Sequence, residues 1–276
     1  HKSFQLNGNS FLSSDEIIAY SKTVSDEHYQ FLKDWFSDEK TISVKTSGST
    51  GKPKSIQLKK ELMRNSAKAT GDFFDLSENT TAFLCLPIEY IAGKMMLVRA
   101  ITLGWHIDVV EPNSNPSEKI DKQYDFSAMV PLQLENSLSK IYLIKKLIVG
   151  GGVVSNSLQA KLQNKTTQVF ATYGMTETIT HVAIRRINGP ARSETFSALP
   201  NVKFSQDDRD CLVISAPDIS EEKVITNDVV ALQSPTSFVW LGRYDNVINS
   251  GGVKIFPEKV EEILSENIAE PFIKKK

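Results

Sequence analysis

The chain has 276 residues, of which 40% are hydrophobic and 24% charged, and its formal net charge is −1. This composition is typical of a globular protein with a sizeable core, in one large domain or two smaller ones. The near-neutral charge does not favour nucleic acid as a partner, and charged residues interrupt the longest apolar region, 82–105, so we expect no stable membrane insertion. Only Cys85 and Cys211 are present, which argues against a disulfide framework or a thiolate metal site and favours the cytoplasm.

Two amphipathic helices are predicted first, starting near Ser14 and Ser25, because each serine precedes an acidic first turn. Alternating segments at 41–45 and 55–58 then predict two paired strands around a short loop. Beyond them, strands alternate with helices, which predicts a mostly parallel sheet covered by helices. The strands are expected at 82–86, 106–110, 126–130, 147–149 and 169–172, and the helices at 61–74, 93–103, 131–138 and 155–162.

The pattern changes after His181, where short apolar segments are separated by turn residues. Strands are expected at 182–186, 202–205, 211–215, 229–232 and 238–241. This spacing predicts a smaller β-rich subdomain.

The loop between the first two strands is rich in hydroxyls and glycines and ends in lysines: Thr46, Ser47, Gly48, Ser49, Thr50, Gly51, Lys52, Pro53 and Lys54. Glycines allow close approach of backbone N–H groups, and hydroxyls and lysines add donors and positive charge, so a polyphosphate is the expected ligand. The spacing is not that of a Walker loop. A flexible linker is the alternative, but the paired strands on either side favour a positioned loop.

A second polar segment follows the predicted strand 169–172. Tyr173 offers a stacking face, Thr176 a phosphate donor and Glu177 an oxygen ligand for Mg²⁺, which takes one or two carboxylates together with substrate phosphates. An ordinary polar turn explains this segment about equally well.

Other candidate positions have comparable structural explanations. Gly150, Gly151 and Gly152 allow close approach of a flat ligand or simply form a turn, and Asp228 is suited to a ribose diol or to capping a turn. The segment 241–261 predicts a charged turn, a glycine-rich hairpin and a helix with Pro257 in its first turn, which is either a hinge or only a hairpin.

Together, segments 46–54, 173–178 and 242–261 resemble, in order, the signature motifs of the ATP-dependent acyl-adenylating (AMP-binding, acyl-CoA synthetase) superfamily. Segments 86–94, with Arg99, 130–134 and 172–185 look most like the o-succinylbenzoate–CoA ligases of menaquinone biosynthesis. The resemblance implies an α/β fold with a large N-terminal adenylate-forming domain of helix-covered, mostly parallel sheets and a small β-rich subdomain.

The resemblance also implies which ligands bind and which residues contact them. The ligands would be ATP, Mg²⁺, coenzyme A as co-substrate and a carboxylic acid, with o-succinylbenzoate favoured. ATP would contact Thr46 to Lys52, Gly151, Gly152, Thr172, Tyr173, Gly174, Thr176, Asp228 and Arg243. The acid would contact Tyr90, Arg99, Gly150 and Gly174, with Arg99 holding a distal carboxylate; otherwise Arg99 would extend its charge to solvent. Thr176, Glu177 and Lys52 would be catalytic, Glu177 the metal ligand and Asp245 the hinge.

The family's late catalytic lysine motif is absent, Tyr90 stands where relatives often have histidine, and Asn227 stands where they usually have glycine. We therefore expect residues 1–242 to form the N-terminal domain, with 181–242 as its β-rich part. Residues 243–276 would form the hinge and the truncated start of a C-terminal domain. The alternative functions are ligation of another aryl or fatty acid, an adenylation domain that loads a carrier protein, and nucleotide binding without turnover.

Overall fold

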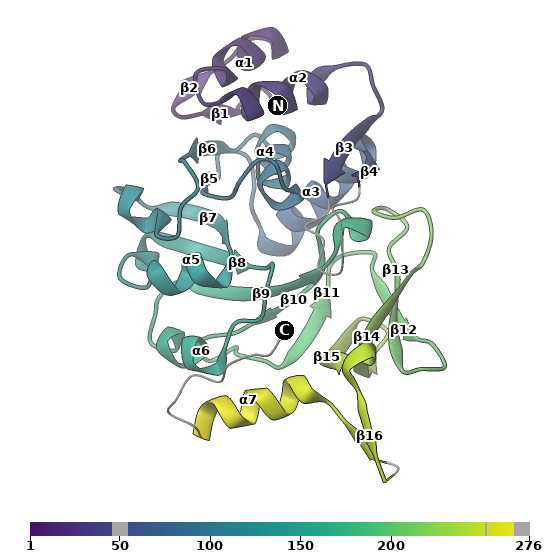
Figure 1. Cartoon of the computed structure of the whole chain (residues 1–276). Coiled ribbons are helices and arrows are strands. Elements are labelled where there is room, and N and C mark those ends of the chain that lie inside the picture. Colours follow the sequence, from purple (N-terminus) through teal and green to yellow (C-terminus); the bar gives the residue numbers. More distant parts are fainter. Residues whose placement is uncertain (46–54, 252, 268–276) are drawn as a thin grey trace.

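The computed structural model of the chain describes residues 1–45, 55–251 and 253–267. Its α-helices are α1 (Ser14–Ser21), α2 (Asp26–Phe36), α3 (Lys60–Phe74), α4 (Ile91–Leu103), α5 (Pro131–Asn136), α6 (Asn156–Leu162) and α7 (Pro257–Asn267). The strands before residue 175 are β1 (Gln5–Leu6), β2 (Asn9–Ser10), β3 (Thr41–Lys45), β4 (Ser55–Lys59), β5 (Thr81–Leu84), β6 (His106–Val109), β7 (Tyr124–Met129), β8 (Ile144–Val149) and β9 (Gln168–Gly174). The later strands are β10 (His181–Arg186), β11 (Thr195–Ala198), β12 (Lys203–Gln206), β13 (Cys211–Ser215), β14 (Val224–Ser234), β15 (Ser237–Arg243), β16 (Ile248–Ser250) and β17 (Val253–Ile255). Figure 1 shows α1 and α2 at one end of the molecule and α7 with β16 at the other.

The two predicted N-terminal helices are confirmed, and serine side chains cap both. Ser13 accepts a hydrogen bond from the backbone N–H of Glu16, and Ser25 accepts one from the backbone N–H of His28. These bonds satisfy backbone donors that a helix start leaves free.

Most strands form one mixed sheet in the order β12-β13-β14-β15-β11-β10-β9-β8-β7-β5-β6-β1-β2. The pairs β5–β6, β5–β7, β7–β8 and β8–β9 are parallel, as the alternation of strands and helices predicted. Alternate residues of β5 face opposite sides: Ala82 and Leu84 join the core that contains α3 and α4, whereas Phe83 joins the core that contains α5 and α6. Helices therefore cover both faces of the parallel part.

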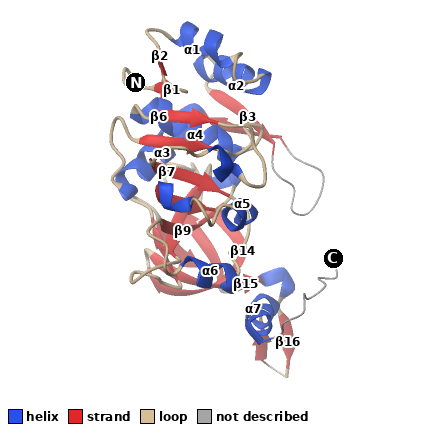
Figure 2. Cartoon of the chain, turned by 90° about the vertical axis from the view of Figure 1, so that its left-hand side faces the viewer, coloured by secondary structure: helices blue, strands red, loops and turns tan. Residues whose placement is uncertain are grey.

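The β-rich segment after residue 181 continues this sheet rather than forming a separate one. Strand β10 pairs with β9 in antiparallel fashion, and β11 joins β10 to β15. The sequence pattern missed β11 as well as the short β1 and β2. Figure 2 shows β6, β7, β9 and β14 following one another along the molecule.

Strands β3 and β4 form the predicted hairpin, with Lys45 opposite Ser55. The expected phosphate loop, Thr46 to Lys54, lies outside the described residues. Its strand neighbours are confirmed, and its ligand remains a prediction.

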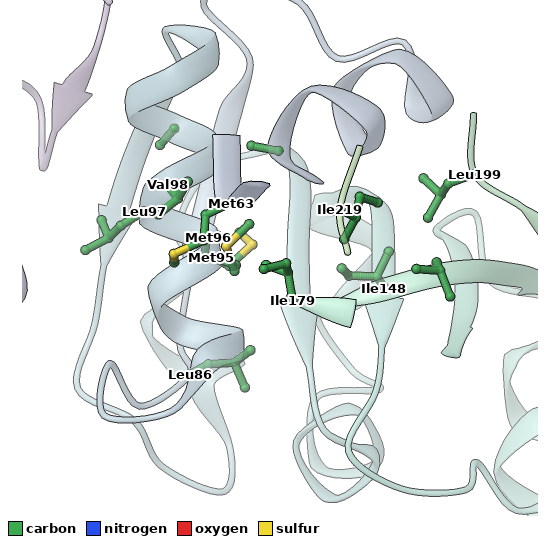
Figure 3. Close-up of a cluster of buried hydrophobic side chains, with 14 of the residues drawn as sticks. Met63, Leu86, Met95, Met96, Leu97, Val98, Ile148, Ile179, Leu199 and Ile219 are labelled. Atoms are coloured by element: carbon green, nitrogen blue, oxygen red, sulfur yellow. The ribbon is translucent and has the colours of Figure 1, made fainter. Parts of the chain in front are cut away.

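Helix α4 is buried on almost every side, and consecutive side chains from Met95 to Ile101 are 6% exposed or less. Figure 3 shows Met95 and Met96 on the side of α4 that faces Ile179. Gly93 allows this helix to lie against the carbonyl group of Pro87, where an added Cβ would collide. Among the described helices, none combines the length and the apolar character needed to cross a bilayer.

Candidate active site

One part of the predicted site, around Gly150 to Gly152, lies where parallel strands β7, β8 and β9 reach their carboxyl ends. Gly150 follows β8, and its N–H donates to the carbonyl oxygen of Met129 at the end of β7 (3.2 Å). A Cβ on Gly150 would lie 2.6 Å from Oγ1 of Thr172 on β9, so glycine is needed for this close packing. Gly151 has φ of +75°, and both Gly151 and Gly152 are exposed, which leaves their backbone open to a ligand.

Tyr173 is tied to a strand that is distant in sequence. Its hydroxyl donates to Oδ2 of Asp228 on β14 (2.6 Å), and its ring meets Phe196 and Phe238 edge-on. Burial, followed by the Asp228 carboxylate, raises the pKa of Tyr173, so the phenol stays protonated and continues to donate. The predicted nucleotide residues of β9 and β14 are thus brought together.

Asp228 is buried, and its second oxygen, Oδ1, accepts a hydrogen bond from the indole N–H of Trp240 (3.0 Å). Arg243 lies opposite Asp228 in the β14–β15 register, with its Nη1 3.9 Å from Oδ1. A carboxylate has about four lone-pair sites, so the hydrogen bonds from Tyr173 and Trp240 leave acceptor capacity for another donor. Ribose binding by Asp228 and Arg243 remains a prediction.

The expected hinge residue, Asp245, follows β15. Its Oδ2 lies 3.3 Å from Nη2 of Arg243 and accepts a hydrogen bond from the side-chain amide of Asn227 (3.4 Å). These contacts connect the start of the 243–267 segment to the strand that carries Asp228. The hinge role and the domain boundaries stay predictions.

The turn after β9 presents the expected phosphate and metal residues. Thr176 and Glu177 lie in a short 3₁₀ helix, Thr176–Thr178, and Glu177 is exposed. Within the described ranges, no group of three or more His, Cys, Asp or Glu side chains is arranged to hold a metal ion. A magnesium ion at Glu177 would therefore need oxygen ligands from phosphates and water, which is its common manner of binding in nucleotide sites.

Arg99 does not reach solvent, so the alternative of an extended, solvated side chain is wrong. The residue is 2% exposed, and its guanidinium donates to the hydroxyls of Thr70 on α3 (3.3 Å) and Thr180 (3.2 Å). No carboxylate among the described residues forms an ion pair with it, and burial lowers its pKa to about 9. Arg99 is therefore a buried, protonated cation at neutral pH, and the described part of the chain supplies no counter-ion for it.

Further polar side chains surround Arg99, and sequence reasoning missed them. Thr180 Oγ1 also lies 3.1 Å from Oγ of Ser66, and Nε2 of buried His181 lies 3.4 Å from Oγ1 of Thr70. Burial, and then the charge of Arg99, keeps the pKa of His181 well below its usual value, so His181 is neutral. The available signal was the spacing of Ser66 and Thr70, which places two hydroxyls on one face of an otherwise apolar helical stripe.

Tyr90, also expected at the acid, lies at the start of α4 and is 49% exposed. Arg99 lies nine residues further along, about 14 Å at the rise of an α-helix. The two side chains therefore lie about two and a half helical turns apart along α4 rather than at one contact point. A surface hollow lined by Trp35, Arg64 and Thr102 lies apart from the predicted site residues.

Comparison with known proteins agrees with this fold. The family model described as AMP-binding enzyme matches residues 44–205, more than half of the chain, so the chain belongs to this family. The chain is similar to the 2-succinylbenzoate–CoA ligase of Lactococcus lactis, at 22% identity over 83% of the chain and 56% of the relative. It is also similar to the enzyme of that name from Escherichia coli, at 25% identity over 81% of the chain and 52% of the relative. The chain thus spans about half the length of these curated relatives.

Solved structures show the same fold. An acyl-CoA synthetase (AMP-forming)/AMP-acid ligase II-like protein from Dyadobacter fermentans superposes with a TM-score of 0.76 at 38% identity, over 87% of this chain and 70% of that one. The o-succinylbenzoate coenzyme A synthetase of Bacillus subtilis, solved with ATP and magnesium ion, superposes with a TM-score of 0.67 at 19% identity, over 93% and 67% of the two chains.

Proposed function

We propose that this chain provides the adenylate-forming part of an acid–CoA ligase, with 2-succinylbenzoate as the acid. Membership of the AMP-binding family and the names of the relatives support the reaction class. The observation that carries the substrate assignment is the buried guanidinium of Arg99, which has no protein counter-ion among the described residues.

An unpaired buried charge is costly, because desolvation costs several kcal/mol and no nearby opposite charge offsets it. A substrate carboxylate would supply that opposite charge and would also accept hydrogen bonds from the guanidinium. Thr180 Oγ1 and Thr70 Oγ1 already orient the Arg99 guanidinium. Binding of a ligand would therefore cost little further conformational entropy at this side chain. A monocarboxylic fatty acid would not supply this charge, because its one carboxylate reacts with ATP and its apolar chain would leave Arg99 unpaired. An acid with a second carboxylate would supply it.

The nucleotide would bind at the β8–β9 edge. Exposed Gly151 and Gly152 would face the adenine together with Tyr173, and Asp228 with Arg243 would hold the ribose. Thr172, Gly174 and Thr176 would lie along the phosphates, and we assign the β- and γ-phosphates to residues Thr46 to Lys52 from sequence alone. Mg²⁺ at Glu177 would neutralise phosphate charge, and the exposed carboxylate is suited to that role.

The first step would join a carboxylate oxygen of the acid to the α-phosphorus of ATP, while the bond to the β-phosphate oxygen breaks and pyrophosphate leaves with the electron pair. This step requires no proton transfer, so the residues contribute by holding the reactants in line and by balancing charge. In the second step, the thiolate of coenzyme A would attack the acyl carbon and release AMP. Gly150 and Gly174 would contact the reacting carboxylate through their backbones, and Tyr90 would line the acid's entry. The buried, free Cys85 and Cys211 fit a reducing cytoplasm.

The test compares two acids that differ only in the proposed contact. Titration calorimetry would measure binding of 2-succinylbenzoate and of 3-benzoylpropionate, which lacks the ring carboxylate, to the wild-type chain and to Arg99→Met. We expect wild type to prefer the dicarboxylate by a hundredfold or more, about 3 kcal/mol, and Arg99→Met to bind the two acids equally. If wild type and Arg99→Met show the same ratio of affinities for the two acids, the substrate assignment is wrong. Absence of Mg²⁺-dependent ATP binding would refute the reaction class.

A further inference from the structure

The turn that joins β9 to β10 contains a strained residue at its centre. Ile179 has φ of +65° and ψ of −64°, and the N–H of Thr180 donates to the carbonyl oxygen of Thr178 (2.7 Å), which closes a γ-turn. This γ-turn is rare, and a positive φ is costly for a β-branched residue. Such a conformation persists only where its surroundings fix it.

Two features fix this turn. The Ile179 side chain is 1% exposed and belongs to the same buried cluster as Met95 and Met96 (Figure 3). The hydroxyl of Thr178, which is fully buried, accepts a hydrogen bond from the N–H of Met175 (3.0 Å). Its single hydrogen points to the carbonyl oxygen of Met175 (3.0 Å) or of Thr180 (2.8 Å). Thr178 therefore links the first residue of the turn to the last.

The two ends of the turn lead to different parts of the candidate site. Thr176 and Glu177 lie between the linked residues, whereas the Thr180 hydroxyl contacts Arg99 and Ser66. The Thr180 carbonyl also lies so close to Gly174 that a Cβ there would collide with it. A change in the turn would therefore move Glu177, the proposed metal residue, together with the hydroxyl that contacts Arg99.

We propose that Thr178 is a positioning residue that holds Glu177 and Thr180 in a fixed relation, so that the nucleotide and the acid meet in one geometry. Thr178 is buried beneath the turn and would act only through these two residues. This inference depends on the proposed function, because it assigns the nucleotide to one end of the turn and the acid to the other.

The test uses a substitution that keeps the shape of the side chain and removes its hydroxyl. Thr178→Val should weaken Mg²⁺-dependent ATP binding and 2-succinylbenzoate binding by about tenfold each, the effect of one buried hydrogen-bonding link. Thr178→Ser, which keeps the hydroxyl, should restore both affinities to within about twofold of wild type. Thr167→Val is the matched control, because Thr167 is also buried and donates to the carbonyl oxygen of Ile141 (2.5 Å) beside the opposite end of β9.

Calorimetric titrations and melting curves would be measured on wild type, Thr178→Val, Thr178→Ser and Thr167→Val. We expect both Val variants to melt earlier, but only Thr178→Val to lose affinity for both ligands. If Thr178→Val binds both ligands as well as Thr167→Val does, or loses only one of them, the positioning role is wrong. Should Thr178→Val fail to fold, Thr178→Ala takes its place, and its affinities for ATP with Mg²⁺ and for 2-succinylbenzoate are compared in the same way. Failure of the wild-type chain to bind either ligand would instead count against the proposed function.

Discussion

Replacing Arg99 by methionine should make the protein more stable while removing its preference for a dicarboxylate. Burial lowers the pKa of Arg99 to about 9, because desolvation acts against the charged form, and burying an unpaired charge costs several kcal/mol. Hydrogen bonds to Thr70 and Thr180 offset part of this penalty. Exchanges of buried ion pairs for apolar side chains of similar volume are often neutral or stabilising by about 1–4 kcal/mol, and for this unpaired charge we expect a gain of about 1–3 kcal/mol.

The substitution leaves few polar groups without partners. The Thr70 hydroxyl still donates to the carbonyl oxygen of Ser66 (3.0 Å), and Thr180 Oγ1 still lies beside Oγ of Ser66. The predicted gain in stability therefore does not depend on rearrangement of the surrounding hydroxyls.

Urea unfolding monitored by tryptophan fluorescence would measure the change in unfolding free energy, and a melting curve should shift upward by about 2–4 °C per kcal/mol. Arg192→Met is the control, because Arg192 is exposed and its side chain forms a surface ion pair with Glu194 (3.3 Å), so the loss of this pair should change stability by less than about 1 kcal/mol. A loss of more than 1 kcal/mol in Arg99→Met would show that Arg99 stabilises the fold, and the argument for an unpaired charge would fail.

Three further predictions concern the metal residue, a close contact and pH. Glu177→Gln should leave stability within about 0.5 kcal/mol, because Glu177 is exposed, and should weaken ATP binding in Mg²⁺ but not in EDTA, as measured by calorimetry. Gly174→Ala should destabilise the protein by about 2–4 kcal/mol in urea, because its Cβ would collide with backbone atoms of Thr180 and His181. At Gly152 the nearest atom would be 3.5 Å away, so alanine should be tolerated there. His28 and His181 are both buried, and burial lowers their pKa values, so the unfolded chain binds protons that the native protein does not. Stability should therefore be full above about pH 6.5 and fall by up to about 1.4 kcal/mol per histidine for each pH unit below it; a flat stability between pH 7 and 5 would contradict this.

Local patterns carried a large part of the fold. The helix starts at Ser14 and Asp26 agree with predictions from serine caps and acidic first turns, because capping involves residues only three positions apart. The alternation of strands and helices from β5 to β9 was also predicted correctly, because burial of one face imposes a regular spacing of apolar residues on the sequence. Strand β11 was missed because its residues 195–198 carry little apolar signal and obtain their place from β10 and β15.

The sequence by itself determined the order of the motifs, the pairing of the strands on either side of residues 46–54 and the choice of candidate side chains, because these depend on short segments. Only the tertiary structure decided what surrounds them. It joined the β-rich strands to the parallel sheet, linked Tyr173 to Asp228 across 55 residues, and surrounded Arg99 with Thr70 and Thr180 instead of a carboxylate. Hydrophobic periodicity reports that a side chain is buried, but the partners it meets are set by long-range packing, which no local pattern encodes.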